Sequence, residues 1–181
     1  LRSLVGSEMC IRDSYKADSN GYLIPITEDG WILLDGADYY IENSQLIKGK
    51  AYKINDVWYG FDYSGKMYTN DTFNVFYRAK SDGSLYCSEW YQDNDGSWYY
   101  YDENAKCVTG TVQIQNTMYV FDSNGILKTS SAVQMGIDYK LADQNGVWVQ
   151  TPGWVQKNSC WYYVQQDGTC LLYTSPSPRD S

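Results

Sequence analysis

The sequence predicts an all-β fold, a solenoid of about eight stacked β-hairpin repeats of about 20 residues each. A short motif recurs along the chain, and the apolar residues show no helical periodicity. The aromatic residues are also unusual, with 19 tyrosines and 7 tryptophans against only 4 phenylalanines. A buried core prefers Leu, Ile, Val and Phe. Tyrosine and tryptophan instead suit half-exposed contact surfaces, because their rings combine apolar faces with a polar group.

The repeat consists of an aromatic entry, a polar turn, a glycine or small residue, and an apolar residue two places further on. "WYGFDYSGKM" and "MYVFDSNGIL" show it clearly. The glycine position, 18 to 24 residues apart in successive copies, is occupied by Gly21, Gln45, Gly65, Gly83, Ala105, Gly125, Gly146 and Gly168. A tyrosine stands six residues earlier in seven copies, at Tyr15, Tyr39, Tyr59, Tyr77, Tyr99, Tyr119 and Tyr162.

Each copy is expected to form one β-hairpin. The aromatic entry has high strand propensity. The segment that follows should turn, because Asp and Asn bond their own backbone and glycine accepts a positive φ. A single short hairpin cannot bury its own apolar face, so neighbouring copies must stack on one another.

The two ends of the chain have a different character. Permitted codons for residues 4–13 and 170–180 can be chosen so that the two DNA strings are reverse complements over nearly their whole length. The string also resembles a transposase adapter used in sequencing libraries. We therefore expect residues 1–14 and 170–181 to be translated adapter. The alternative is a genuine Pro/Ser-rich tail. On this interpretation residues 15–169 are a repeat array and an internal fragment of a larger protein.

Composition excludes several classes of function. The net charge is −8, whereas nucleic acids and anionic membranes require Lys/Arg patches, so we expect no nucleic-acid partner and no membrane insertion. There is no histidine, which removes the commonest general base and metal ligand. The cysteines of the array, Cys87, Cys107 and Cys160, follow no metal-ligand spacing and are odd in number. We expect them to be small apolar fillers, and we expect no metal and no cofactor.

Two copies are more complete than the others. "EWYQDNDGSWYYYDENAKCVTGT" and "GWVQKNSCWYYVQQDGT" contain a first tryptophan, a spacer, Trp-Tyr-Tyr and a polar turn. In this the chain resembles the cell-wall-binding, choline-binding-type repeat family, which is related to glucan-binding repeats and clostridial-toxin repeats. The resemblance implies a superhelix of stacked hairpins with aromatic ligand pockets between consecutive hairpins. It also implies an extracellular location at the cell surface or cell wall.

The family's pocket, carried over to this sequence, needs two tryptophans from one hairpin and an aromatic residue from the next. The most complete set is Trp90, Trp98 and Tyr119. A second set contains Trp154 and Trp161, with its next hairpin expected to be missing. Trp31 is a weaker candidate, because Asp38 stands where the second tryptophan should be.

The resemblance predicts a non-catalytic module that binds choline-like or glycan ligands of a bacterial cell-wall polymer such as choline-substituted teichoic acid. A choline head group would be held by cation–π attraction. The alternative is a structural spacer or protein-contact stalk without a small ligand, attached to an unseen enzyme or toxin domain. In that case the aromatic residues only pack hairpin against hairpin.

The recurring acids raise the question of a glycosidase, which needs two facing carboxylates. They are Asp18, Glu42, Asp62, Asp102, Asp122 and Asp143. Because all of them lie at one turn position of successive copies, a turn-stabilising role explains the whole set. We therefore expect no catalysis in this chain; a catalytic domain would lie elsewhere in the parent protein.

Overall fold

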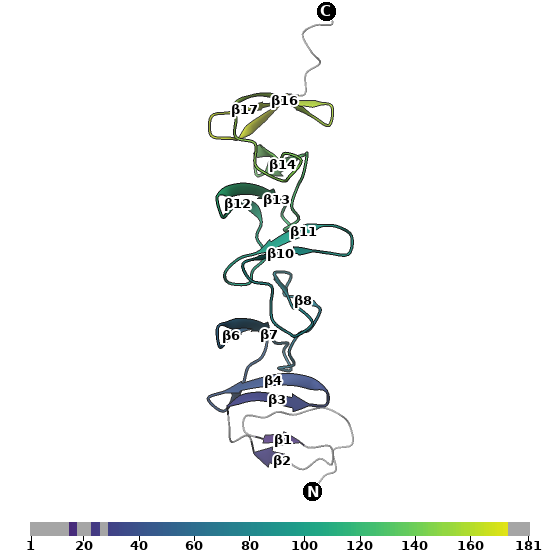
Figure 1. The fold of residues 1–181 in the computed structure, drawn as a ribbon, viewed down its shortest axis with the longest axis vertical. Coiled ribbons are helices and arrows are strands. Elements are labelled where there is room, and N and C mark those ends of the chain that lie inside the picture. The colour runs from purple at the N-terminus through teal and green to yellow at the C-terminus, as the bar shows by residue number, and fades with distance from the viewer. Residues whose placement is uncertain (1–14, 18–22, 26–28, 174–181) are drawn as a thin grey trace, which may run out of the picture. The chain divides into compact units, whose positions relative to one another are not determined.

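The computed structural model describes residues 15–17, 23–25 and 29–173 as strands and turns. The described residues up to Cys87 form one compact unit, and those from Ser88 onward form a second. Figure 1 shows short hairpins following one another along the chain. The all-β prediction is thus confirmed, whereas the stacking of about eight hairpins into a single solenoid stays a prediction. The described part of the chain contains no helix long and apolar enough to cross a membrane.

The first unit contains four antiparallel pairings of neighbouring strands, one of which is extended to a three-stranded sheet by β5. The strands are β1 (Tyr15–Ala17), β2 (Leu23–Pro25), β3 (Gly30–Leu34), β4 (Ala37–Glu42), β5 (Gln45–Leu46), β6 (Ala51–Ile54), β7 (Val57–Gly60), β8 (Thr72–Phe73) and β9 (Tyr77–Arg78). The tight turns have left-handed residues, as at Asn55 and Asp56, with φ of 48° and 65°. Such turns match the twist of the flanking strands.

The second unit contains the pairs β10–β11 and β12–β13 and one five-stranded sheet of order β14-β15-β18-β17-β16. The strands are β10 (Glu89–Gln92), β11 (Trp98–Tyr101), β12 (Gly110–Ile114), β13 (Thr117–Phe121), β14 (Ala132–Met135), β15 (Asp138–Leu141), β16 (Gly153–Lys157), β17 (Cys160–Val164) and β18 (Cys170–Tyr173).

Strand β18 lies beyond residue 169, where the sequence interpretation placed the end of the array. It pairs with β17 over its whole length, from Val164↔Cys170 to Trp161↔Tyr173. Cys170 is 1% exposed and belongs to a core cluster with Leu141 and Val164. The last repeat therefore has a return strand in the structure, contrary to the expectation that it stops at its turn. The origin of residues 1–14 and 170–181 in adapter DNA stays a prediction, and residues 1–14 and 174–181 lie outside the described residues.

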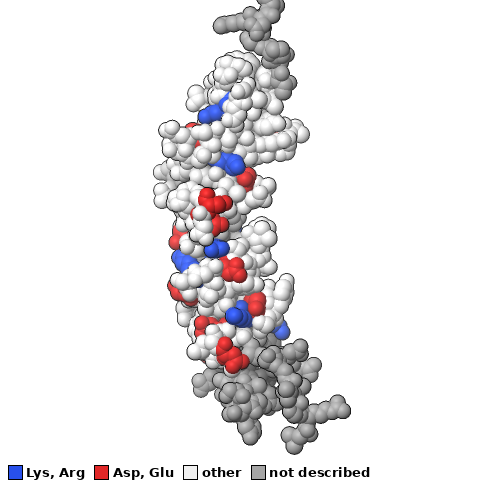
Figure 2. Space-filling view, turned by 90° about the vertical axis from the view of Figure 1, so that its right-hand side faces the viewer, with Lys and Arg blue, Asp and Glu red and all other residues white. Residues whose placement is uncertain are grey.

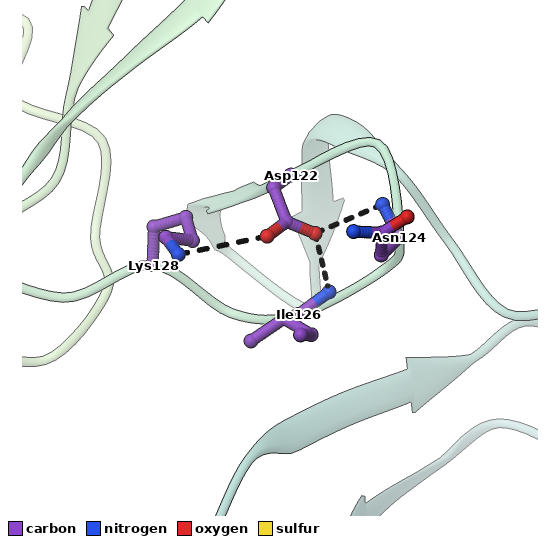
Figure 3. Close-up of polar contacts among 4 residues, drawn as sticks. All are labelled: Asp122, Asn124, Ile126 and Lys128. Carbon is purple, nitrogen blue, oxygen red and sulfur yellow. Dashed lines mark hydrogen bonds and ion pairs between the residues drawn. The ribbon is translucent and has the colours of Figure 1, made fainter.

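The predicted turn role of the acids is confirmed at four of the six positions. In the turn shown in Figure 3, one oxygen of Asp122 accepts the backbone N–H groups of Asn124 and Ile126, at 2.9 and 3.0 Å. Its other oxygen lies 3.5 Å from the Lys128 ammonium. The same pair of bonds, to the second and fourth residues that follow, recurs at Asp62, Asp102 and Asp143.

The remaining two positions differ. Asp18 lies outside the described residues. Glu42 does not bond its own turn, because its carboxylate accepts the hydroxyl of Tyr52 instead. In that copy the left-handed turn residues are Asn43 and Ser44, and the N–H groups of both bond to Asp29, at 2.8 and 2.9 Å. Gln45 therefore starts strand β5 and does not fill the predicted glycine position.

The glycine position has two roles, which Gly146 illustrates. Its φ is +81°, a region that other residues avoid. A Cβ built on it would meet the Leu127 side chain of the preceding copy at 2.6 Å. Met67 lies against Gly83 in the same way, and Trp148 against Gly168. The apolar residue of one copy thus packs onto the turn of the next, and this contact stacks adjacent copies within each unit.

Candidate ligand-binding site

Trp90 and Trp98 lie on one face of the first hairpin of the second unit. Trp90 pairs across the sheet with Tyr100 and Gln92 pairs with Trp98, so the two indoles are diagonal neighbours. Their ring centroids are 6.3 Å apart and the rings are inclined at 80°. Trp98 stays 42% exposed. Strand alternation alone brings these two rings together, as the sequence predicted.

The next copy supplies the third ring. Tyr119, on β13, lies with its ring centroid 5.1 Å from that of Trp90, at 75°. Behind it the fully buried Phe121 lies 5.8 Å from Trp90 at a shallow angle of 29°. Since Phe121 anchors β13 in the core and Tyr119 is two residues away on the same strand, the phenol has a fixed position beside the indole.

An open pocket of about 400 Å³ is lined by Trp90, Trp98, Tyr119, Leu127 and Asn145. The structure thus brings together the three residues of the most complete predicted set. It adds two that the sequence analysis did not propose as ligand contacts. The N–H of Leu127 donates to the carbonyl of Trp98 at 2.8 Å. Asn145 belongs to the turn of the following copy, where the backbone N–H of Val120 donates to Gly146 at 3.0 Å.

The repeat itself contains a signal for both added residues. Leu127 is the apolar residue two places after the glycine position of its copy, and Asn145 immediately precedes the next glycine position. The lining therefore draws on three consecutive copies. It combines three aromatic rings, one aliphatic side chain and one carboxamide, and contains no Asp, Glu, Lys or Arg.

Trp154 and Trp161 reproduce the first part of this arrangement. Their centroids are 6.4 Å apart at 81°, and Tyr163 lies 5.2 Å from Trp154 at 65°. The third ring is Tyr173 of β18, 4.7 Å from Trp154. The expectation that this set lacks its third ring is therefore wrong for the structure. The ring comes from a strand of the same sheet, whereas Tyr119 comes from a separate hairpin.

Apart from a second tryptophan, the aromatic neighbours of Trp31 match those of Trp90. The ring centroid of Trp31 lies 5.1 Å from that of Tyr40 and 4.8 Å from that of Tyr59. The strand register confirms that Asp38 takes the place of the second tryptophan, because Leu33 pairs with Asp38 as Gln92 pairs with Trp98. The first and third rings of the set, Trp31 and Tyr59, therefore meet, and the carboxylate of Asp38 stands in place of the second indole.

Cys107, in the second unit, is a packing residue. Cys107 lies against Gly125, and burial, followed by the charge of Asp122, raises the pKa of its thiol to about 11. A thiol with that pKa stays protonated at neutral pH and is a poor nucleophile or metal ligand. This agrees with the expectation that the cysteines fill small apolar spaces.

On the face shown in Figure 2, acidic and basic residues are interspersed among uncharged ones. One exposed ion pair, Lys53 with Asp56 at 3.2 Å, and the Lys128–Asp122 pair illustrate this mixing. Exposed pairs of this kind contribute little to stability.

Comparison with known proteins finds a family model that matches two copies of the repeat. The model of the putative cell wall binding repeat matches residues 88–104 and 153–170, the two copies that contain Trp90 with Trp98 and Trp154 with Trp161. These two copies thus match the putative cell wall binding repeat. The resemblance drawn from the sequence is therefore confirmed.

Solved structures with related repeats come from Streptococcus pneumoniae. CbpJ is 26% identical with a TM-score of 0.57, over 87% of this chain and 56% of that one. Choline binding protein F, solved in the presence of a peptidoglycan analogue, is 29% identical with a TM-score of 0.56, over 84% of this chain and 54% of that one.

A curated relative is glucosyltransferase-S of Streptococcus mutans, 27% identical over 143 residues. These residues make up 78% of this chain but only 10% of the relative. The chain therefore spans a tenth of this enzyme's length and little more than half of the two solved structures.

Proposed function

We propose that this chain is a non-catalytic cell-wall-binding module whose pocket at Trp90, Trp98 and Tyr119 binds a choline-like quaternary ammonium group of a wall polymer. The observation that carries the proposal is that three rings line one open pocket. The rings of Trp98 and Tyr119 are inclined at 80° and 75° to that of Trp90. The proposal places the module outside the cell, at the cell wall.

The shape and chemistry of the pocket favour a compact cation. Rings set at steep angles enclose a roughly spherical group on several sides, and each ring presents its negative face to a positive charge. A flat sugar ring would need one broad aromatic face and several polar partners, whereas Asn145 is the one polar side chain among the lining residues other than the phenol of Tyr119 and the indole N–H groups. A quaternary ammonium has no hydrogen-bond donor, so a pocket with few acceptors loses nothing in binding it.

The recurring acids support the absence of catalysis. The carboxylates of Asp62, Asp102, Asp122 and Asp143 accept backbone N–H groups of their own turns. That use explains their regular spacing without a reaction. The stalk alternative has no observation of comparable weight, because simple packing of hairpins does not require an open pocket lined by two indoles.

The test is a choline titration followed by NMR at the indole N–H of Trp90. We expect saturable shifts in the wild-type chain, and a loss of about 1–2 kcal/mol, roughly 5- to 30-fold in Kd, in Trp98→Ala. Trp161→Ala is the matched control, because that residue has the same repeat position and an exposure of 43% against 42%. It should leave the titration at Trp90 unchanged.

Two results would contradict the proposal. If choline leaves the Trp90 resonance in place, the pocket does not bind quaternary ammonium. If a wall-derived glycan shifts that resonance where choline does not, the pocket is a glycan site and the ligand class is wrong.

A further inference from the structure

The rings around Trp31 are arranged like those around Trp90. Trp31 lies 5.1 Å from Tyr40 at 63°, and Trp90 lies 5.2 Å from Tyr100 at 64°. The ring of the following copy is also matched, at 4.8 Å and 73° for Tyr59 against 5.1 Å and 75° for Tyr119. A buried phenylalanine also recurs: the centroid of Phe61 lies 6.0 Å from that of Trp31, with the rings inclined at 34°, as Phe121 lies beside Trp90. Two walls of an ammonium site are therefore built in the first unit.

The third wall is different in kind, because it is the carboxylate of Asp38. Asp38 and Tyr40 lie on the same face of β4, whose residues alternate between buried and half-buried. Tyr40 pairs directly with Trp31, so Asp38 is the diagonal neighbour of the indole. The backbone confirms the position, since the N–H of Met67 donates to the carbonyl of Asp38 at 2.8 Å, as Leu127 donates to Trp98.

With Asp38 in place of a second indole, both Trp31 and Asp38 are partly exposed to solvent. Trp31 is 43% exposed, whereas Trp90, which has Trp98 beside it, is less exposed and counts as half-buried. The half-buried carboxylate of Asp38 makes no hydrogen bond or ion pair with any described residue.

A second acid of the first unit stands at a related repeat position. Asp82 holds the turn position that Asn145 holds beside the Trp90 pocket, since Ser84 bridges to Tyr59 as Val147 bridges to Tyr119. One of its oxygens accepts the backbone N–H and the hydroxyl of Ser84, at 3.0 and 2.7 Å. The Lys80 ammonium also acts on this carboxylate. Asp38, whose carboxylate has no such bonds, is therefore the stronger candidate to receive a ligand.

We propose that Trp31, Tyr59 and Asp38 form a binding site for a primary ammonium group, R–NH₃⁺. The two rings attract the positive charge through their faces. The carboxylate accepts the N–H donors that a primary ammonium has and a quaternary one lacks, and such charge-assisted bonds are about twice as strong as neutral ones. The same scaffold thus has two sites of opposite preference, a methylated cation at Trp90 and a protonated amine at Trp31.

The test compares an amino alcohol, an amino sugar and a methylated cation on the full chain. Ethanolamine, glucosamine and choline are titrated at about pH 6, below the usual pKa of the amines. The readout is the indole N–H resonance of Trp31, assigned with Trp31→Phe. We expect ethanolamine or glucosamine to shift it at lower concentration than choline. A response to one amine alone assigns the source of the ammonium group, and a response to neither overturns the site.

The role of Asp38 is tested by Asp38→Asn, which keeps the shape and removes the charge. Ethanolamine should bind about 10-fold more weakly, as expected for one charge-assisted hydrogen bond. Asp35→Asn is the control, because it removes the same charge from the exposed turn of the same hairpin and should leave the affinity unchanged. Asp38→Trp restores the ring set of the Trp90 pocket and should shift the preference toward choline.

Equal effects of Asp38→Asn and Asp35→Asn would overturn the assignment, as would choline binding to the wild-type site as tightly as ethanolamine. This site and the Trp90 pocket are followed by different indole resonances, so failure of either proposal is seen separately.

Discussion

Gly146→Ala tests whether the copies stack through the glycine position. The substitution has two consequences in the structure. An alanine at a φ of +81° takes up a left-handed conformation, which costs about 1–2 kcal/mol. Its methyl group would also lie 2.6 Å from Cδ1 and 2.8 Å from Cγ of Leu127. Moving a packed leucine aside costs about 1–3 kcal/mol more. The expected loss in the free energy of unfolding is therefore about 2–5 kcal/mol.

Gly96→Ala separates the two contributions. Gly96 has a similar φ of +87°, but a Cβ built on it meets no atom within 4 Å. This variant should lose only the conformational share, about 1–2 kcal/mol. The difference between the two variants then measures the contact with Leu127. At the repeat position of Gly146 another copy has Ala105, with a φ of +58°, so the backbone at this position can accept an alanine.

The assay is urea unfolding, combined with hydrogen exchange at the N–H of Val120, which donates to the carbonyl of Gly146. Exchange there should be accelerated more in Gly146→Ala than in Gly96→Ala. Because Leu127 also lines the Trp90 pocket, Gly146→Ala should weaken choline binding as well. Equal destabilisation by the two variants would refute the idea that the turn of one copy rests on the apolar residue of the preceding one.

Two further predictions follow from shifted pKa values. Hydrogen bonds from the side chain and then the backbone N–H of Ser84 and Thr169 lower the pKa of Asp82 and Asp167. A lowered folded-state pKa stabilises the fold above the unfolded value, near 3.8, and that contribution is lost as pH falls through the folded-state value. The urea concentration at the unfolding midpoint should therefore decrease as the pH is lowered below about 4. The decrease should be less steep in Asp82→Asn, and identical pH profiles of the variant and the wild type would contradict the assignment. For Cys107, a pKa of about 11 leaves only about one thiol in a thousand ionised at pH 8. In the native chain its alkylation by iodoacetamide, followed by peptide mass spectrometry, should be far slower than in urea, and equal rates would show that the thiol is not buried.

Much of the site was predictable from the sequence because its first two rings are local. Trp90 and Trp98 flank one short turn, and strand alternation puts them on the same face. Tyr119 followed from the repeat, because an aromatic residue at a fixed repeat position meets the preceding copy. The turn acids followed for the same reason, since an Asp that bonds the second and fourth residues ahead needs no distant partner.

The errors occurred where a residue's partner lies outside its own turn. Glu42 looked like a turn acid, but Tyr52 of the next hairpin takes its carboxylate and Asp29 bonds the turn instead. The last repeat looked incomplete, but residues 170–173 form a strand on which Cys170 and Leu172 share the inward face, and Cys170 is buried in the core. No pattern within one copy indicates these contacts.

The sequence by itself determined the hairpin of each copy and the pair of indoles on it, because strand propensity, turn chemistry and alternation act over a few residues. Only the tertiary structure decided which further side chains line the pocket. Leu127 and Asn145 reach the Trp90 pocket because successive copies stack with the apolar residue of one against the glycine of the next. The same stacking sets Tyr59 against Trp31 and leaves Asp38 as the third wall. Each candidate site thus combines a local pair within one hairpin with residues of later copies, which only packing between hairpins brings together.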